Sequence, residues 1–171
     1  LYAESETLLA NLIRFTAPMH LPGFTSSDEF TKAYPFIPYQ FPLLQAVFTR
    51  ARQMGASGKH LASGERSMLD AFKIASQALQ QQPLGTLAPF HLFYEAIAGF
   101  LEGAVKRVIE RASDNPALRP WDVDLLKTLF MVKYVSSFPG TVENLTTLSL
   151  TQIGEDRLLL SQRIASSLER L

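Results

Sequence analysis

The sequence predicts an all-α protein of 171 residues. Apolar residues recur at helical spacing in almost every segment, proline and glycine fall between these segments, and no segment alternates as a half-buried strand does. The chain is 47% hydrophobic and 19% charged. This composition is typical of a globular protein with enough apolar surface to bury a core.

The first 55 residues predict three helices. Residues 4–15 carry one apolar stripe, which ends before Pro18. Ser26 and Glu29 have the spacing of a capping box and start a short second helix. A third helix is predicted to begin near Gln40 and to end at Gly55. Pro42 would lie in its first turn, where proline is tolerated.

Two longer helices follow. One opens at Ser63 and is expected to bury a stripe of five side chains: Met68, Leu69, Phe72, Ala75 and Leu79. The next is expected to run without a break from Pro89 to Arg111 as a central helix. The residues expected to be buried along it are Phe93, Ile97, Leu101 and Val108.

The segment SDNPALRP separates a C-terminal unit from the rest, which divides the chain into a helical bundle, 1–115, and a three-helix unit, 116–171. Pro120 suits the first turn of its first helix, a short helix covers 141–150, and a third begins at 155. This outline is that of a helix-turn-helix, or of a winged-helix-like unit that is truncated. Acidic residues balance the arginines of the last helix, which favours a packing role over strong binding of DNA phosphates.

Charge and composition argue against several classes of protein. Lys and Arg number 16, as do Asp and Glu, so no net charge attracts nucleic acid or an anionic membrane. The chain contains no cysteine and no apolar run that could span a bilayer. We therefore expect no membrane partner and a cytoplasmic location. Asn144 begins a glycosylation sequon. We give this motif little weight because the sequence shows no secretory signal.

The familiar catalytic motifs are incomplete. Around Gly58-Lys59 a Walker A loop would need glycine where Gln53 stands and a hydroxyl where His60 stands. The three histidines lie in separate segments without ligand spacing, so no metal site is expected. No nucleophile elbow presents a serine. We therefore expect no catalytic residues and no enzyme activity in this chain alone.

One local feature suggests phosphate contact. The stretch from Arg50 to Lys73 is basic within a neutral protein. Lys59, Ser63 and Arg66 lie where a glycine-broken loop meets a helix N-terminus, and together they could contact a phosphate that a neighbouring domain binds. In the alternative interpretation, which the residues alone favour, Ser63 is an N-cap and Arg66 a surface or packing residue.

The order of five segments resembles one family. These segments are YPFIPYQFPLLQ, GASGKHLASGERSMLDAF, PFHLFYEAIAGFLEGAVKRVIERA, WDVDLLKTLFMVKYV and PGTVENLTTLSL. From about residue 30 to 171 they are similar to the interior of the large P-loop ATPase of BREX bacteriophage-exclusion systems, the BrxC and PglY family. The chain also begins without methionine and ends inside a periodic segment, so we expect it to be a piece of a longer polypeptide.

The resemblance implies a helical, lid-like region that follows an AAA+-like core, in a protein that defends bacteria against phage. It implies ATP and Mg²⁺ for the full-length parent and no cofactor for this segment. It implies the rest of the ATPase, further copies and other BREX proteins as partners. By the same resemblance Arg66, with Lys59 and Ser63, would sense the nucleotide phosphates. The alternative is a DNA-binding helix-turn-helix adaptor of the same defence system.

Overall fold

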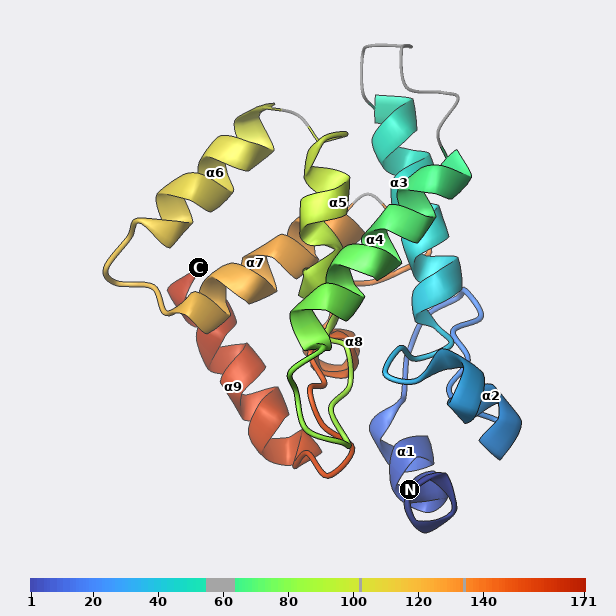
Figure 1. Cartoon of the computed structure of the whole chain (residues 1–171). Helices are drawn as coiled ribbons and strands as arrows, with labels where there is room; N and C mark the ends of the chain where they lie inside the picture. The colour runs from blue at the N-terminus through green and yellow to red at the C-terminus, as the bar shows by residue number, and fades with distance from the viewer. Residues whose placement is uncertain (55–63, 102, 134) are drawn as a thin grey trace.

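The prediction of an all-α fold is confirmed by a computed structural model, which describes residues 1–54, 64–101, 103–133 and 135–171 (Figure 1). Side chains of residues 54 and 64–66 are outside this description. In the described ranges the only β pairing is an isolated bridge between Thr86 and Gln152. The elements are α1 (Tyr2–Leu12), α2 (Ser27–Ala33), α3 (Gln40–Met54), α4 (Gly64–Leu79), the 3-10 helix η2 (Phe90–Phe93), α5 (Tyr94–Ala98), α6 (Gly103–Ser113), α7 (Pro120–Val132), α8 (Val142–Leu148) and α9 (Arg157–Arg170).

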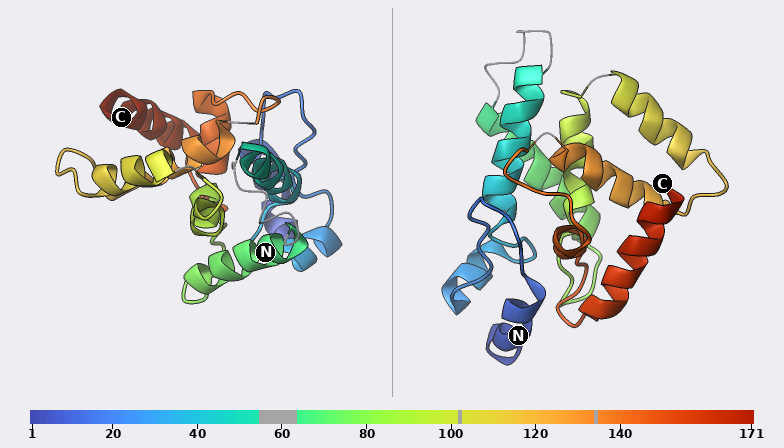
Figure 2. Two further views of the ribbon diagram at one scale, coloured as in Figure 1. Left: turned by 90° about the horizontal axis from the view of Figure 1, so that it is seen from above. Right: turned by 180° about the vertical axis from the view of Figure 1, so that it is seen from behind.

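The helices form two flanks around a central group (Figures 1 and 2). Helices α6 and α9 lie on one side and α1, α2 and α3 on the other, with α5 and α8 between them. Helix α7 contacts α5, α6, α8 and α9, and α4 contacts α3 and α5. The predicted boundary near residue 115 falls between α6 and α7, and one apolar cluster contains residues from both sides of it.

Aromatic rings fill the centre of this cluster. Phe93 is fully buried, and its ring contacts three others in tilted or edge arrangements. The centroid distances are 5.1 Å to Phe72, 5.5 Å to Phe90 and 6.1 Å to Phe36. Such pairs stabilise a fold beyond the area that they bury. The 3-10 helix is therefore attached through its side chains to α4 and to the segment before α3.

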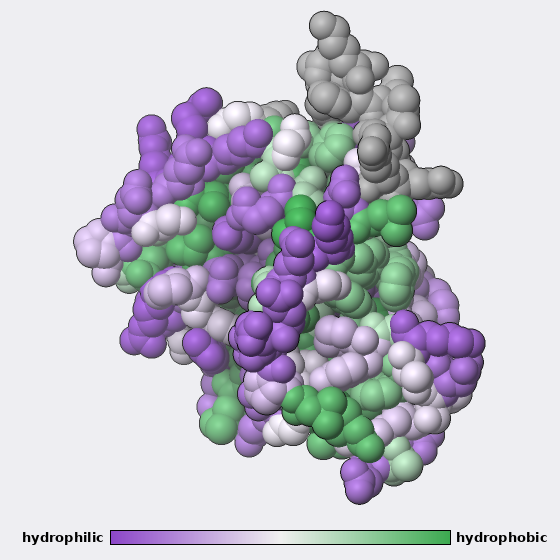
Figure 3. Space-filling model, in the orientation of Figure 1, coloured by the Kyte–Doolittle hydropathy of each residue, from purple (hydrophilic) through white to green (hydrophobic). Residues whose placement is uncertain are grey.

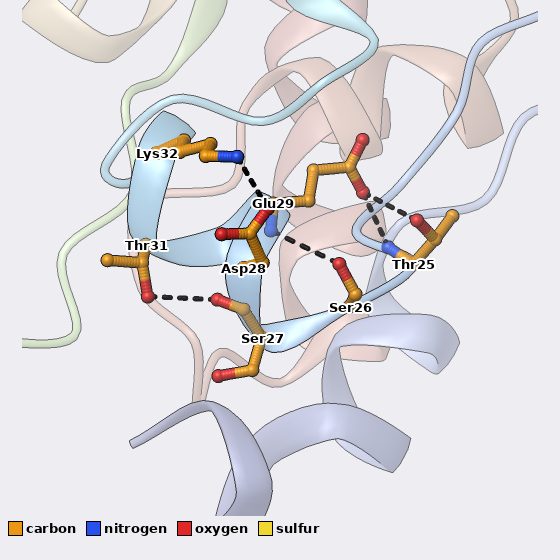
Figure 4. A network of polar contacts seen from close by, with 7 residues as sticks. All are labelled: Thr25, Ser26, Ser27, Asp28, Glu29, Thr31 and Lys32. Carbon is orange, nitrogen blue, oxygen red and sulfur yellow. Dashed lines mark hydrogen bonds and ion pairs between the residues drawn. The ribbon is translucent and has the colours of Figure 1, made fainter.

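Helix α2 begins at the predicted cap (Figure 4). The Ser26 hydroxyl accepts from the Glu29 backbone N–H at 3.1 Å. The Glu29 carboxylate accepts from the backbone N–H of Thr25 at 2.7 Å and from its hydroxyl at 2.9 Å. The predicted return bond to Ser26 is thus made one residue earlier. The observed bond to Thr25 has the same role as the predicted bond to Ser26. Each gives a partner to a backbone amide at the helix N-terminus that would otherwise lack one.

The predicted central helix is broken, and this is a correction. The chain forms η2 and α5 up to Ala98, turns, and starts α6 at Gly103. Phe93 and Ile97 are buried as predicted, and Leu101 is half-buried, but Val108 is 43% exposed. Glycines at 99 and 103 lower the helix propensity at the break.

A second prediction was also wrong. Leu69 was expected to be buried, but it is 73% exposed. Helix α4 buries Ala71 and Ala75 and half-buries Met68, Phe72 and Leu79, so its inward stripe includes Ala71 and leaves Leu69 outside. The face seen in Figure 3 carries hydrophilic side chains over α4 and α6, with apolar groups between them. The predicted five-residue stripe was one position too wide.

The C-terminal helices begin within two residues of the predicted positions. Pro120 occupies the first turn of α7, the Thr141 hydroxyl caps α8, and the Asp156 carboxylate caps α9 by accepting from two backbone amides. Before α9, Ile153 donates its backbone N–H to the Gly85 carbonyl at 2.9 Å. The connection into the last helix is thus held against the segment that precedes η2.

Candidate functional site

Two regions carry the functional hypotheses, and the first is the basic stretch between α3 and α4. Lys59 and Ser63 lie outside the described residues, and so does the side chain of Arg66, whose backbone belongs to the first turn of α4. In the described part of the stretch, Arg50 donates to the Gln53 side chain at 3.1 Å. Nucleotide sensing by Arg66, Lys59 and Ser63 therefore stays a prediction.

The second region is α9, the helix that would read DNA in a helix-turn-helix. Arg157, at its first position, points back into the protein. Its guanidinium donates to the Leu12 carbonyl at 2.7 Å, to the Thr147 hydroxyl at 2.9 Å and to the Glu143 carbonyl at 3.1 Å. Burial lowers the pKa of Arg157, yet a guanidinium remains charged at any physiological pH. Arg157 thus joins α1, α8 and α9.

Arg163, in the middle of α9, stacks on α7. Its guanidinium carbon lies 3.8 Å from the centroid of the Trp121 ring. This is cation–π geometry, in which a planar guanidinium is attracted to the negative face of an indole. The contact holds α9 against the first turn of α7.

Arg170, in the last turn of α9, forms a buried ion pair with Asp122. Its guanidinium donates to the two carboxylate oxygens at 2.9 and 2.6 Å. Ser167 donates its hydroxyl to the same carboxylate at 2.5 Å, and the Arg119 backbone N–H donates at 2.9 Å. Asp122 is fully buried, whereas the Arg170 side chain is 29% exposed.

These bonds fix the charge of Asp122. Hydrogen bonds from Arg170 are the largest influence on its pKa, and those from Ser167 and Arg119 act in the same direction. Together they outweigh desolvation and hold the pKa of Asp122 well below its usual range. A carboxylate that remains charged and fully bonded at neutral pH serves as a structural link between α7 and α9.

Asn144 makes a comparable link between α8 and the N-terminal segment. It is fully buried, and its side-chain oxygen accepts from the Thr16 backbone N–H at 2.8 Å. Its amide donates to the carbonyls of Thr16 at 3.0 Å and Pro139 at 2.8 Å. All polar atoms of this side chain are engaged, so the sequon at Asn144 is inaccessible in the folded protein.

His91 lies where η2 meets α7. Its Nε2 atom is 3.8 Å from the Asp124 carboxylate. Burial is the largest influence on its pKa and lowers it, while Asp124 opposes the shift and Lys127 adds to it. In the described ranges, no three His, Asp or Glu side chains gather closely enough to hold a metal ion.

The arrangement of α7, α8 and α9 is therefore that of an internally bonded packing unit. Sequence reasoning identified the arginines of α9 and the acidic residues beside them. It missed the partners, because Asp122 and Arg170 lie 48 positions apart. No described helix is long and apolar enough to cross a membrane.

In comparisons with known proteins, no family model matches the chain and no solved structure matches it significantly.

Proposed function

We propose that the chain is a non-catalytic helical segment of a BREX-type AAA+-like P-loop ATPase, which acts in the cytoplasm in bacterial defence against phage. Its tasks would be nucleotide sensing, oligomerisation and contact with partner proteins. The order of the resembling segments and the all-helical fold support this proposal. ATP and Mg²⁺ would bind to the rest of the parent ATPase.

One observation favours this function over the DNA-binding adaptor, namely that the three arginines of α9 contact the protein itself. Arg157 donates to backbone and hydroxyl oxygens, Arg163 stacks on Trp121, and Arg170 pairs with Asp122. A helix that binds DNA needs cations free to replace the counterions of the phosphates. The side chains that face solvent at the start of α9 are instead Leu158 and Leu159, which are 67% and 63% exposed.

The isolated 171-residue chain is expected not to hydrolyse ATP. The reason is that its glycine and lysine residues do not complete a phosphate loop, and its sequence contains no motif that would hold the Mg²⁺ of a nucleotide. Phosphate release from purified chain is the measurement. Turnover above background that a substitution within these 171 residues abolishes would contradict the proposal.

In the full-length parent, Arg66→Ala is expected to lower ATP turnover or nucleotide-dependent assembly. A guanidinium presents a planar fork of donors to phosphate oxygens, and the N-terminal end of α4 adds a favourable dipole. Arg66→Lys keeps the charge without the fork and should restore activity only in part. The measurements are ATPase rate, assembly by light scattering and melting temperature.

Arg107→Ala is the matched control for Arg66→Ala, because it removes an exposed arginine from α6. Arg107→Ala should unfold within about 0.5 kcal/mol of the parent, as surface substitutions do. If Arg66 serves the nucleotide, Arg66→Ala should lose no more stability than this control. A large loss of stability in Arg66→Ala, with normal activity per folded molecule, would show that Arg66 is only structural.

A further inference from the structure

A groove lies between α3 and the segment that joins α7 to α8. One wall is the outward stripe of α3, which includes Gln45, Thr49, Arg50 and Gln53, and the other is formed by residues 135–137. The groove has a volume of about 450 Å³. Sites for small molecules have volumes of roughly 300–1,000 Å³, so the groove has the size of a ligand site.

The lining is rich in hydrogen-bond donors. Arg50 is exposed, and its one hydrogen bond among the described residues uses a single Nη1 to reach Gln53. A guanidinium has five N–H donors, and the described residues engage only one of them. The Gln45 side chain and the Ser136 hydroxyl are also exposed, and neither is hydrogen-bonded within the described part of the chain.

The charge of the groove has one sign. Arg50 is the only charged side chain among the described residues that line it, and no carboxylate is among them. An anion entering the groove would therefore meet a guanidinium, two side-chain amides and a hydroxyl, and no described lining residue would repel it. Guanidinium forks match phosphate oxygens, and their charge-assisted bonds are about twice as strong as neutral ones.

From this geometry we infer that the groove binds the phosphoryl group of a small molecule, with Arg50 as the main contact and Gln45, Gln53 and Ser136 as neutral donors. A phosphoryl group offers more acceptor oxygens than a carboxylate, which suits donors placed on both walls. The residues named for this site all lie in the described part of the chain, and Lys59, Ser63 and Arg66 are not among them. It does not depend on the family of the protein.

The test is isothermal titration of the 171-residue chain with pyrophosphate, ATP and adenosine. We expect the two phosphates to bind saturably at millimolar concentration and adenosine not to bind. Equal affinity for pyrophosphate and ATP would support a site for the phosphate alone, and tighter binding of ATP would support a site that also contacts the nucleoside. Absence of saturable binding by both phosphates would overturn the inference.

Substitutions tie the binding to the groove. Arg50→Ala should weaken phosphate binding about tenfold or more, as the loss of a charge-assisted hydrogen bond does, and Arg50→Lys should be intermediate. Arg107→Ala removes the same charge from α6, which lies far from α3 (Figure 1), and should bind like the parent. Circular dichroism checks that each variant is folded.

Unchanged affinity in Arg50→Ala, or an equal loss in Arg107→Ala, would overturn the inference. Neither result bears on ATP turnover by the parent, so this test and that of Arg66 fail independently.

Discussion

Phe93→Ala is expected to destabilise the chain by about 3–5 kcal/mol, the usual cost of removing a fully buried phenylalanine side chain. Phe93 has no exposed surface and lies among the rings of Phe36, Phe72 and Phe90. Its removal would leave a cavity lined by three aromatic groups from separate elements, which cannot all close in on it. Urea unfolding followed by circular dichroism measures the loss.

Phe41→Ala is the matched control. The Phe41 ring stacks on Phe72 with a centroid distance of 4.6 Å, but it is 42% exposed. The same substitution there should cost only about 2 kcal/mol, the value of one aromatic pair together with the part of the side chain that is buried. If Phe93→Ala proved as stable as Phe41→Ala, the placement of η2 in the core would be wrong.

The sequence was sufficient to predict the fold class and most helix starts, because these depend on local chemistry. Ser26 caps α2, Pro120 occupies the first turn of α7, and apolar spacing places α3 and α4 correctly. Caps and first-turn prolines act within three or four residues. No information about distant parts of the chain is needed to recognise them.

The break between α5 and α6 shows where local reasoning was insufficient. The apolar residues between 93 and 108 have helical spacing. This spacing fits one continuous helix as well as two helices separated by a turn. After the turn, α6 buries Val105, Ile109 and Ala112, a stripe with a different phase that leaves Val108 outward. The glycines at 99 and 103 were the available signal, and the apolar residues between them concealed it.

The links between distant elements could not be predicted from the sequence. The partners of Asn144 are backbone groups of Thr16 and Pro139, and Arg157 reaches the Leu12 carbonyl. Backbone acceptors carry no sequence signature, so pairs of this kind become visible only in the folded chain. The groove beside Arg50 has the same origin, since it needs α3 and residues 135–137 to lie together.

Asp122→Asn is expected to destabilise the chain by about 2–4 kcal/mol. This is somewhat less than the cost of breaking a fully buried ion pair, because Arg170 is partly exposed and can still be hydrated. The amide nitrogen that replaces one carboxylate oxygen would face donors from Arg170, Ser167 or Arg119. The matched control is Asp124→Asn, two residues along the same helix, where the carboxylate is 35% exposed. That variant should lose no more than about 0.5–1 kcal/mol. Urea unfolding at pH 7 compares the two.

The pH dependence of Asp122→Asn separates loss of the charge from loss of packing. The pKa of Asp122 is held below its usual value of about 3.9, so the unfolded chain takes up this proton before the folded chain does. The stability that Asp122 contributes is therefore complete above about pH 5 and declines as the pH falls through 4. The gap in unfolding free energy between the parent and Asp122→Asn should narrow over that range, because the variant has no carboxylate to protonate. A gap that stays constant from pH 7 to 3 would show that the ion pair with Arg170 does not stabilise the contact between α7 and α9.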